Sequence, residues 1–120
     1  MKITIFTSNS LRHISLVNKL SSLGHKCYVV IENKSKEIYK KNNLKNKYFN
    51  YVSKSENKFF KGNNFYKKNS FFMSILWGEI NKVEKISLVN FLKSDLYIIF
   101  GASYIKGWLA KFLIKKRAIN

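Results

Sequence analysis

Two short polar segments follow apolar runs that predict β-strands, and both segments could carry ligand-binding groups. Thr7–Ser10 follows KITIF, residues 2–6, and Gly101–Lys106 follows LYIIF, residues 96–100. In an open parallel α/β sheet, ligands bind beyond the carboxyl ends of the strands. These two segments are therefore the first candidates for a functional site.

The first segment offers hydroxyl groups, an amide and the N–H groups at the start of a helix, a combination that suits an anion. Ser8, Asn9 and Ser10 are also favoured N-cap residues, so ordinary helix capping alone explains them. The segment lacks the Gly-x-Gly-x-x-Gly pattern, which disfavours the usual kind of dinucleotide binding.

The second segment permits close approach of a ligand to the backbone. Gly101 allows a tight turn, and the side chains of Ala102 and Ser103 are small. Main-chain N–H and C=O groups could hold a flat ligand there, or the segment could simply connect a strand to a helix. Spacing leaves both interpretations open.

Candidate general acids and bases are few. His13 lies on a predicted helix and His25 just after it, positions where histidine is more often structural than catalytic. Glu32 ends the second predicted strand and could touch a substrate, whereas Asp95 precedes a strand and is expected to cap or to face solvent. No Ser/His/Asp or Cys/His set is visible, so the chain contains no complete catalytic apparatus of its own.

The elements around the first segment form a β-α-β unit. Apolar residues recur at about one helical turn and predict a helix near residues 10–23, with Gly24 placed to end it. KCYVVI, residues 26–31, predicts a second strand. Such units are nearly always right-handed crossovers in a parallel sheet.

The elements around the second segment form a similar unit. LYIIF is continuously apolar, which predicts a fully buried central strand. The following helix has an apolar face made of Ile105, Trp108, Leu109, Phe112 and Leu113, and its C-terminal end carries cations at residues 115–117. Ala118 and Ile119 predict the start of a further strand.

The middle of the chain gives weaker signals. We expect helix plus loop over residues 33–47 and a short third strand over 48–52. A helix is expected near 79–92, where Ile80, Val83, Ile86 and Val89 or Asn90 recur at helical spacing. The Lys- and Phe-rich segment 53–72 resembles an insertion. Its aromatic side chains could stack on bases, but we favour packing of the insertion against the sheet through Phe59, Phe60, Phe71 and Phe72.

Together these elements predict one α/β domain with an open, mostly parallel, Rossmann-like sheet and helices on both faces. The sheet is expected to lack at least one strand at its C-terminal edge. The chain of 120 residues is long enough for one modest core.

Charge, cysteine content and the length of the apolar runs bear on several classes of function. The net charge is +17, but 21 of the basic residues are Lys and only Arg12 and Arg117 are Arg, the residue best suited to bidentate phosphate contacts. A coding bias towards Lys on solvated surfaces therefore explains the charge better than a dedicated nucleic-acid surface does. Cys27 is the only cysteine, so we expect no disulfide framework and no cysteine metal site, as is typical of the cytoplasm. The apolar runs are too short to span a bilayer.

Two parts of the sequence resemble the folate-dependent formyltransferase family, which includes glycinamide ribonucleotide, methionyl-tRNA and sugar N-formyltransferases. DLYIIFGASYIKGWLAKFLIKKRAIN is similar to the family's strand, Gly-containing loop and helix, which lead into a strand with an Asn-x-His motif. MKITIFTSNS and GHKCYVVIENK are similar to the family's first strand, its substrate-side loop and its second strand. The resemblance covers roughly half of the chain.

The resemblance implies transfer of a formyl group from 10-formyltetrahydrofolate to a primary amine, without a metal. By the same resemblance, Asn120 would be the catalytic amide, and the pterin pocket would be lined by Tyr104, Ile105 and Lys106. The residues towards the amine would be Thr7, Ser8 and Asn9. The family's His and later Asp would follow Asn120, so we expect residues 1–120 to be the N-terminal part of such a domain and to be inactive alone.

Two alternatives stay open. The opening β-α-β unit and its Gly-His turn also resemble the N-terminal half of nucleotide-sugar glycosyltransferases, and the positive charge leaves a basic nucleic-acid-binding module possible. Within the formyltransferase interpretation, the acceptor is a small-molecule or amino-sugar amine, or a tRNA. The oligomeric state stays open as well.

Overall fold

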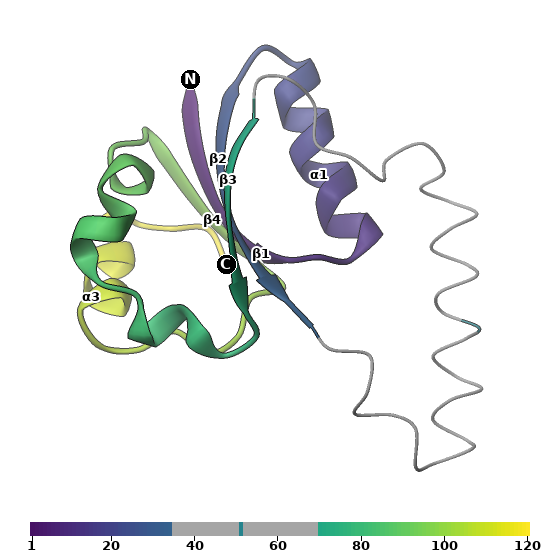
Figure 1. The fold of residues 1–120 in the computed structure, drawn as a ribbon. Helices are drawn as coiled ribbons and strands as arrows, with labels where there is room; N and C mark the ends of the chain where they lie inside the picture. Colours follow the sequence, from purple (N-terminus) through teal and green to yellow (C-terminus); the bar gives the residue numbers. More distant parts are fainter. Residues whose placement is uncertain (35–50, 52–69) are drawn as a thin grey trace.

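The structure is a computed structural model that describes residues 1–34, 51 and 70–120. Its elements follow one another in the order β1 (Lys2–Ser8), α1 (Leu11–Ser22), β2 (Lys26–Asn33), β3 (Ser70–Leu76), η2 (Glu79–Lys82), η3 (Lys85–Leu92), β4 (Leu96–Phe100) and α3 (Gly107–Lys115), where η marks a 3₁₀ helix (Figure 1).

Within these residues, the strands form one four-stranded sheet with the order β3-β2-β1-β4. Every pairing is parallel, and β1 lies between β2 and β4, with Ile5 opposite Val29 on one side and Ile98 on the other. A parallel sheet with helices is the α/β, Rossmann-like architecture that the sequence predicts, so this prediction is confirmed.

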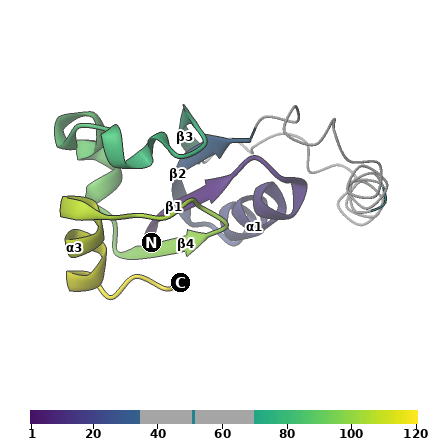
Figure 2. The ribbon, with the colours of Figure 1, turned by 90° about the horizontal axis from the view of Figure 1, so that it is seen from below.

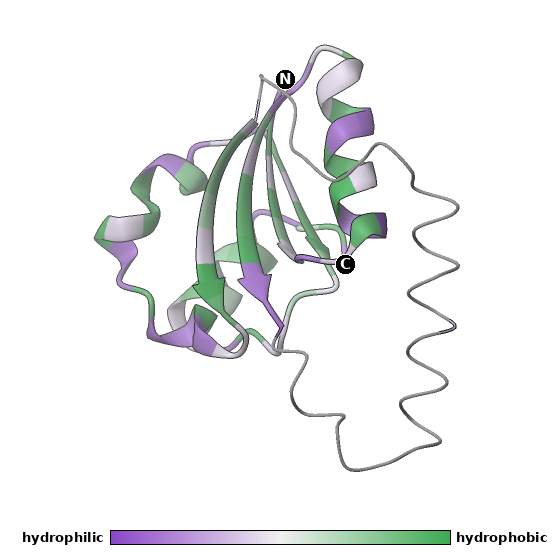
Figure 3. Cartoon of the chain, turned by 45° about the vertical axis from the view of Figure 1, so that its right-hand side comes forward, coloured by the Kyte–Doolittle hydropathy of each residue, from purple (hydrophilic) through white to green (hydrophobic). Residues whose placement is uncertain are grey.

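The helices cover both faces of the sheet (Figures 1 and 2). α1 lies on one face, where Val17 is buried with Ile3, Ile5, Cys27 and Val29. The 3₁₀ helices and α3 lie on the opposite face, over a second core cluster that contains Phe6, Val30, Leu88, Tyr97 and Leu109. Figure 3 shows the strands mostly in the hydrophobic colour, as expected for strands covered on both sides.

The first β-α-β unit matches the sequence prediction closely. α1 starts at Leu11 and ends at Ser22, within the predicted 10–23, and β1 extends two residues beyond the predicted strand. Gly24 has φ +93°, the left-handed conformation expected of a residue that follows a helix. Among the described residues, no helix has both the length and the apolar character needed to cross a membrane.

The prediction of an α-helix over residues 79–92 is wrong in the type of helix and in the residues that face the core. Two 3₁₀ helices occupy this range, because Val83 and Glu84 have extended backbones with ψ 131° and 147°. Ile80, Leu88 and Phe91 face the core, whereas Ile86 and Val89 are exposed. The prediction assumed one continuous helix across the range, whereas the chain is interrupted at Val83 and Glu84.

The third strand is Ser70–Leu76. The predicted strand over 48–52 lies outside the described residues except for Tyr51, which is helical, and the predicted helix plus loop over 33–47 lies outside them beyond Lys34. Phe71 and Phe72 belong to β3 itself, and Phe71 stacks on Tyr28 with ring centroids 5.1 Å apart. The rest of segment 53–72, including Phe59 and Phe60, is outside the described residues.

β4 is less buried than its apolar sequence predicts. Tyr97 is buried but Phe100 is 40% exposed. The physical reason is that β4 pairs along its length only with β1, while its other edge, in the described residues, has a single parallel bridge between Ile98 and Ile119. This bridge agrees with the strand start predicted at Ala118–Ile119.

Candidate functional site

The candidate site lies at the carboxyl edge of the sheet, where β1, β2 and β4 end side by side. β1 continues into α1 on one face, and β4 continues into α3 on the other face (Figure 1). Neighbouring strands whose connections run to opposite faces of the sheet form a topological switch point, where open α/β sheets bind ligands. The β4–α3 connection, residues 101–106, forms one wall and is called the rim loop below.

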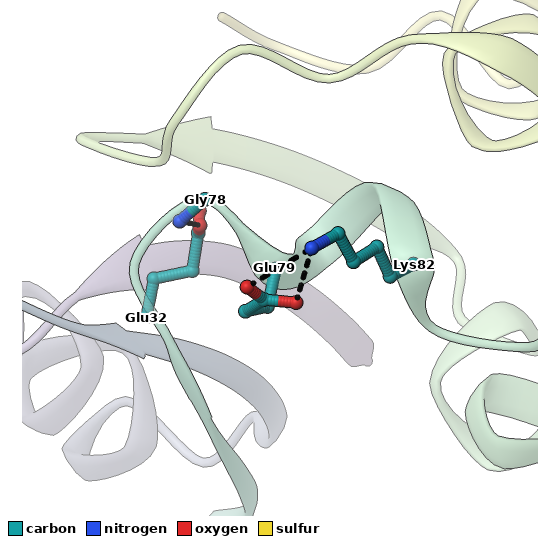
Figure 4. Close-up of polar contacts among 4 residues, drawn as sticks. All are labelled: Glu32, Gly78, Glu79 and Lys82. Carbon is teal, nitrogen blue, oxygen red and sulfur yellow. Dashed lines mark hydrogen bonds and ion pairs between the residues drawn. The ribbon is translucent and has the colours of Figure 1, made fainter.

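A buried carboxylate holds the middle of the rim loop. Glu32, the next-to-last residue of β2, accepts hydrogen bonds from the Ser103 N–H at 2.8 Å and from the Ser103 hydroxyl at 2.5 Å. It also accepts one from the Gly78 N–H at 2.8 Å (Figure 4). The side chain suggested as a substrate contact is instead directed inwards, as a support for two loops.

An amide side chain holds the end of the rim loop. Asn81 in η2 donates to the carbonyl of Tyr104 at 2.7 Å and accepts from the N–H of Lys106 at 2.9 Å. Asn81 and Glu32 together engage the Ser103 N–H, the Tyr104 carbonyl and the Lys106 N–H. Neither side chain binds the N–H group of Tyr104 or of Ile105.

The start of the rim loop rests on a histidine ring. Gly101 has φ +75°, and a Cβ atom placed there would lie 2.2 Å from Cε1 of His13. The same imidazole contacts the Phe100 ring edge-on, with centroids 4.6 Å apart. Gly101 is therefore required both by its backbone conformation and by the ring beneath it.

Burial keeps the His13 ring neutral, and hydrogen bonds fix its orientation. Its Nδ1 lies 2.6 Å from the Ser8 hydroxyl and 2.9 Å from the Ser10 hydroxyl, while Nε2 accepts from the Arg12 Nε–H at 3.3 Å. The Arg12 contact assigns the proton to Nδ1, which then donates to the serine oxygens. Burial, followed by the nearby Arg12 charge, lowers the pKa of His13 to about 4. In this tautomer, His13 supports the loop and cannot deprotonate either serine.

A pocket of about 390 Å³ adjoins the rim loop and brings together distant predicted residues. Ile119 pairs with β4, donating to the Tyr97 carbonyl at 2.9 Å and accepting from the Ile99 N–H at 2.8 Å, and its neighbours Ala118 and Asn120 line the pocket. The lining residues are Ile99, Ala102, Ser103, Tyr104, Ile105, Ala110, Leu113, Ile114, Ala118 and Asn120. Of the predicted donor-side residues, Tyr104 and Ile105 line this pocket with Asn120, and Lys106 does not.

The predicted acceptor-side residues differ strongly in exposure. Thr7 and Ser8 are fully buried, and within the described residues the Thr7 hydroxyl has no hydrogen-bond partner. Asn9 is exposed, and its side-chain oxygen accepts from the Lys34 N–H at 3.2 Å. Of the three, Asn9 alone presents surface to a ligand in this conformation, and an amine-binding role for this segment stays a prediction.

The part of the chain that the structure describes contains no cluster of three or more His, Cys, Asp or Glu side chains able to hold a metal ion. The structural role expected of His13 agrees with its position under the rim loop, whereas sequence reasoning missed the supporting role of Asn81. Gly101 was a local signal that another group lies close to the backbone at that position. That this group is the His13 ring could be found only from the fold.

Comparisons of the chain with family models, with curated proteins and with solved structures found no match. A function for this chain therefore has to be argued from its own residues and their geometry.

Proposed function

We propose that this chain forms the donor-binding side of a folate-dependent formyltransferase domain, which transfers a formyl group from 10-formyltetrahydrofolate to a primary amine. The observation that carries the proposal is the shared pocket of Tyr104, Ile105 and Asn120. The resemblance assigns the first two residues to pterin binding and the third to catalysis. The resemblance requires residues of the rim loop and of the last strand at one site. These residues line the same pocket.

The pocket has properties that fit a pterin ring. Its volume, about 390 Å³, is within the usual range for small-molecule sites. Ile99, Ile105 and Leu113 offer apolar packing to a flat ring, while the rim-loop backbone offers donors and acceptors to the ring edge. Glu32, Asn81 and His13 hold that backbone, so little ordering entropy is lost when a ligand binds.

Asn120 would act on the reacting carbonyl group. The bound donor supplies the activated formyl group. As the amine attacks, the formyl oxygen gains negative charge, and a side-chain N–H of Asn120 can donate a hydrogen bond to it. Loss of one such donor typically lowers kcat about 10²- to 10³-fold.

Proton transfer needs groups beyond those described here. The resemblance assigns it to a His two residues after the Asn and to a later Asp. His13 is neutral and occupied by Ser8, Ser10 and Arg12, so it does not replace them.

Isothermal titration with 5-formyltetrahydrofolate, a stable analogue of the donor, tests the proposal. We expect saturable binding at one site. Tyr104→Ala should weaken it about tenfold, because an 82% exposed ring can be removed without disturbing the core but no longer covers the ligand. Asn120→Ala should change the affinity less than threefold, because its contact forms with the developing oxyanion. Absence of saturable binding to the wild-type chain would refute the proposal.

A further inference from the structure

Glu32 is a carboxylate with unusual surroundings. It is 1% exposed, although carboxylates are rarely buried without a paired cation. Its recorded partners in the described part of the chain are neutral: the Gly78 N–H, the Ser103 N–H and the Ser103 hydroxyl. The contact with the Ser103 hydroxyl is the shortest of the three, at 2.5 Å, and together the hydrogen bonds offset the loss of hydration of a buried carboxyl group.

The three donors come from two segments that are distant in the sequence. Gly78 is 46 residues from Glu32 and lies in the turn between β3 and η2, whereas Ser103 is 71 residues away in the rim loop. The carboxylate therefore fixes one connection against the other. Because Gly78 directly precedes η2, the same contact also steadies the helix that carries Asn81, the second support of the rim loop.

The contacts end next to the residues that line the pocket. Ser103 lines the pocket itself and directly precedes Tyr104 and Ile105. A carboxylate that binds both the N–H and the hydroxyl of Ser103 fixes the backbone and the side chain of that residue together. This contact therefore restrains the backbone immediately before Tyr104 and Ile105.

We infer that Glu32 is a positioning residue, which holds the rim loop in the shape that binds the pterin ring of the formyl donor. This inference rests on the proposed function for the identity of the ligand. The contact between Glu32 and the rim loop stands independently of that identity, which allows the two to be tested separately.

Glu32→Gln is the central test. A Gln side chain keeps the size but replaces one acceptor oxygen with an NH₂ group, which must then face an N–H or O–H donor. Loss of a hydrogen bond to a charged group corresponds to roughly a tenfold change or more in an equilibrium constant. We expect the affinity for 5-formyltetrahydrofolate to fall at least tenfold, and the ¹⁵N–¹H signals of the rim loop to shift or broaden.

Glu79→Gln is the matched control. Glu79 directly follows Gly78 as the first residue of η2, but its carboxylate faces Lys82 at 3.4 Å and its side chain is 41% exposed (Figure 4). The substitution removes the same charge from the same region without touching the rim loop. We expect affinity within twofold of the wild type and unchanged rim-loop signals.

Ser103 variants keep the test decisive if Glu32→Gln does not fold. Ser103→Ala removes the hydroxyl donor and should weaken binding, whereas Ser103→Thr keeps both donors and should restore it. The inference would be overturned if Glu32→Gln or Ser103→Ala bound 5-formyltetrahydrofolate as tightly as the wild type. It would also be overturned if Glu79→Gln lost as much affinity as Glu32→Gln. If the wild-type chain itself does not bind 5-formyltetrahydrofolate, the proposed function is refuted. The positioning role is then tested by the NMR signals alone: unchanged rim-loop signals in the Glu32→Gln and Ser103→Ala variants would refute it.

Discussion

Replacement of Gly101 by Ala is expected to destabilise the protein strongly, because two separate costs coincide at this residue. The backbone has φ +75°, and the added methyl group would lie 2.2 Å from Cε1 and 2.5 Å from Nε2 of His13. Such distances are too short for non-bonded atoms, so the ring or the loop has to move.

The cost can be estimated from these two contributions. A left-handed conformation costs a non-glycine residue about 1–2 kcal/mol. Displacement of the ring breaks its contacts with Ser8 and Ser10, at about 0.5–1.5 kcal/mol for each hydrogen bond. We expect a total loss of about 2–5 kcal/mol in the free energy of unfolding, which is a large fraction of the stability of a small domain.

Urea unfolding followed by circular dichroism measures this loss, and Gly24→Ala is the control. Gly24 has φ +93°, but nothing lies within 4 Å of a Cβ atom built there. Gly24→Ala should therefore lose only the backbone contribution, about 1–2 kcal/mol. The difference between the two variants reports the contact with His13.

A second comparison isolates the ring. In a His13→Ala background, Gly101→Ala should cost about as much as Gly24→Ala, because the methyl group then has space. Equal losses for Gly101→Ala and Gly24→Ala in the wild-type background would refute the reasoning, since the rim loop would not rest on His13.

Three further predictions concern buried groups. The pKa of His13 is lowered from 6.5 to about 4, so the unfolded chain binds the proton more readily; the stability should fall by up to about 3 kcal/mol as the pH drops from about 6.5 to 4, and His13→Gln should flatten that part of a pH–stability curve. Burial raises the pKa of the Cys27 thiol, so a thiol-reactive disulfide reagent should label it only as fast as the protein opens, with urea restoring rapid labelling. Leu109→Ala should cost about 2–5 kcal/mol in urea unfolding because this side chain is 1% exposed, whereas Ile114→Ala, 78% exposed on the same helix, should cost less than about 1 kcal/mol.

The elements at both ends of the chain could be predicted because their signals are local. The KITIF run, the apolar spacing that leads to Gly24, and the apolar face around Leu109 each determine an element without help from distant residues. Residues 79–92 show the limit of such reasoning. Their apolar spacing suggests one helix, but two extended residues at 83 and 84 break it and change which side chains face the core.

The site could be predicted only in part, for a similar reason. Tyr104, Ile105 and Asn120 could be grouped through a resemblance, and they line one pocket. The supports of the rim loop could not be identified, because Glu32 and Ser103 are 71 residues apart in the sequence and meet only once the sheet has formed. Burial of Thr7 and Ser8 likewise depends on the whole fold.

A titration of the ¹⁵N-labelled chain with 5-formyltetrahydrofolate, followed by amide NMR signals, tests the proposed donor site most directly. The proposal predicts that the largest shifts occur at Ala102–Lys106 and at Asn120, with small shifts elsewhere. Absence of saturable shifts would contradict it. So would shifts centred on the apolar groove between η3 and α3, which is lined by Ile86, Val89, Leu92 and Phe112.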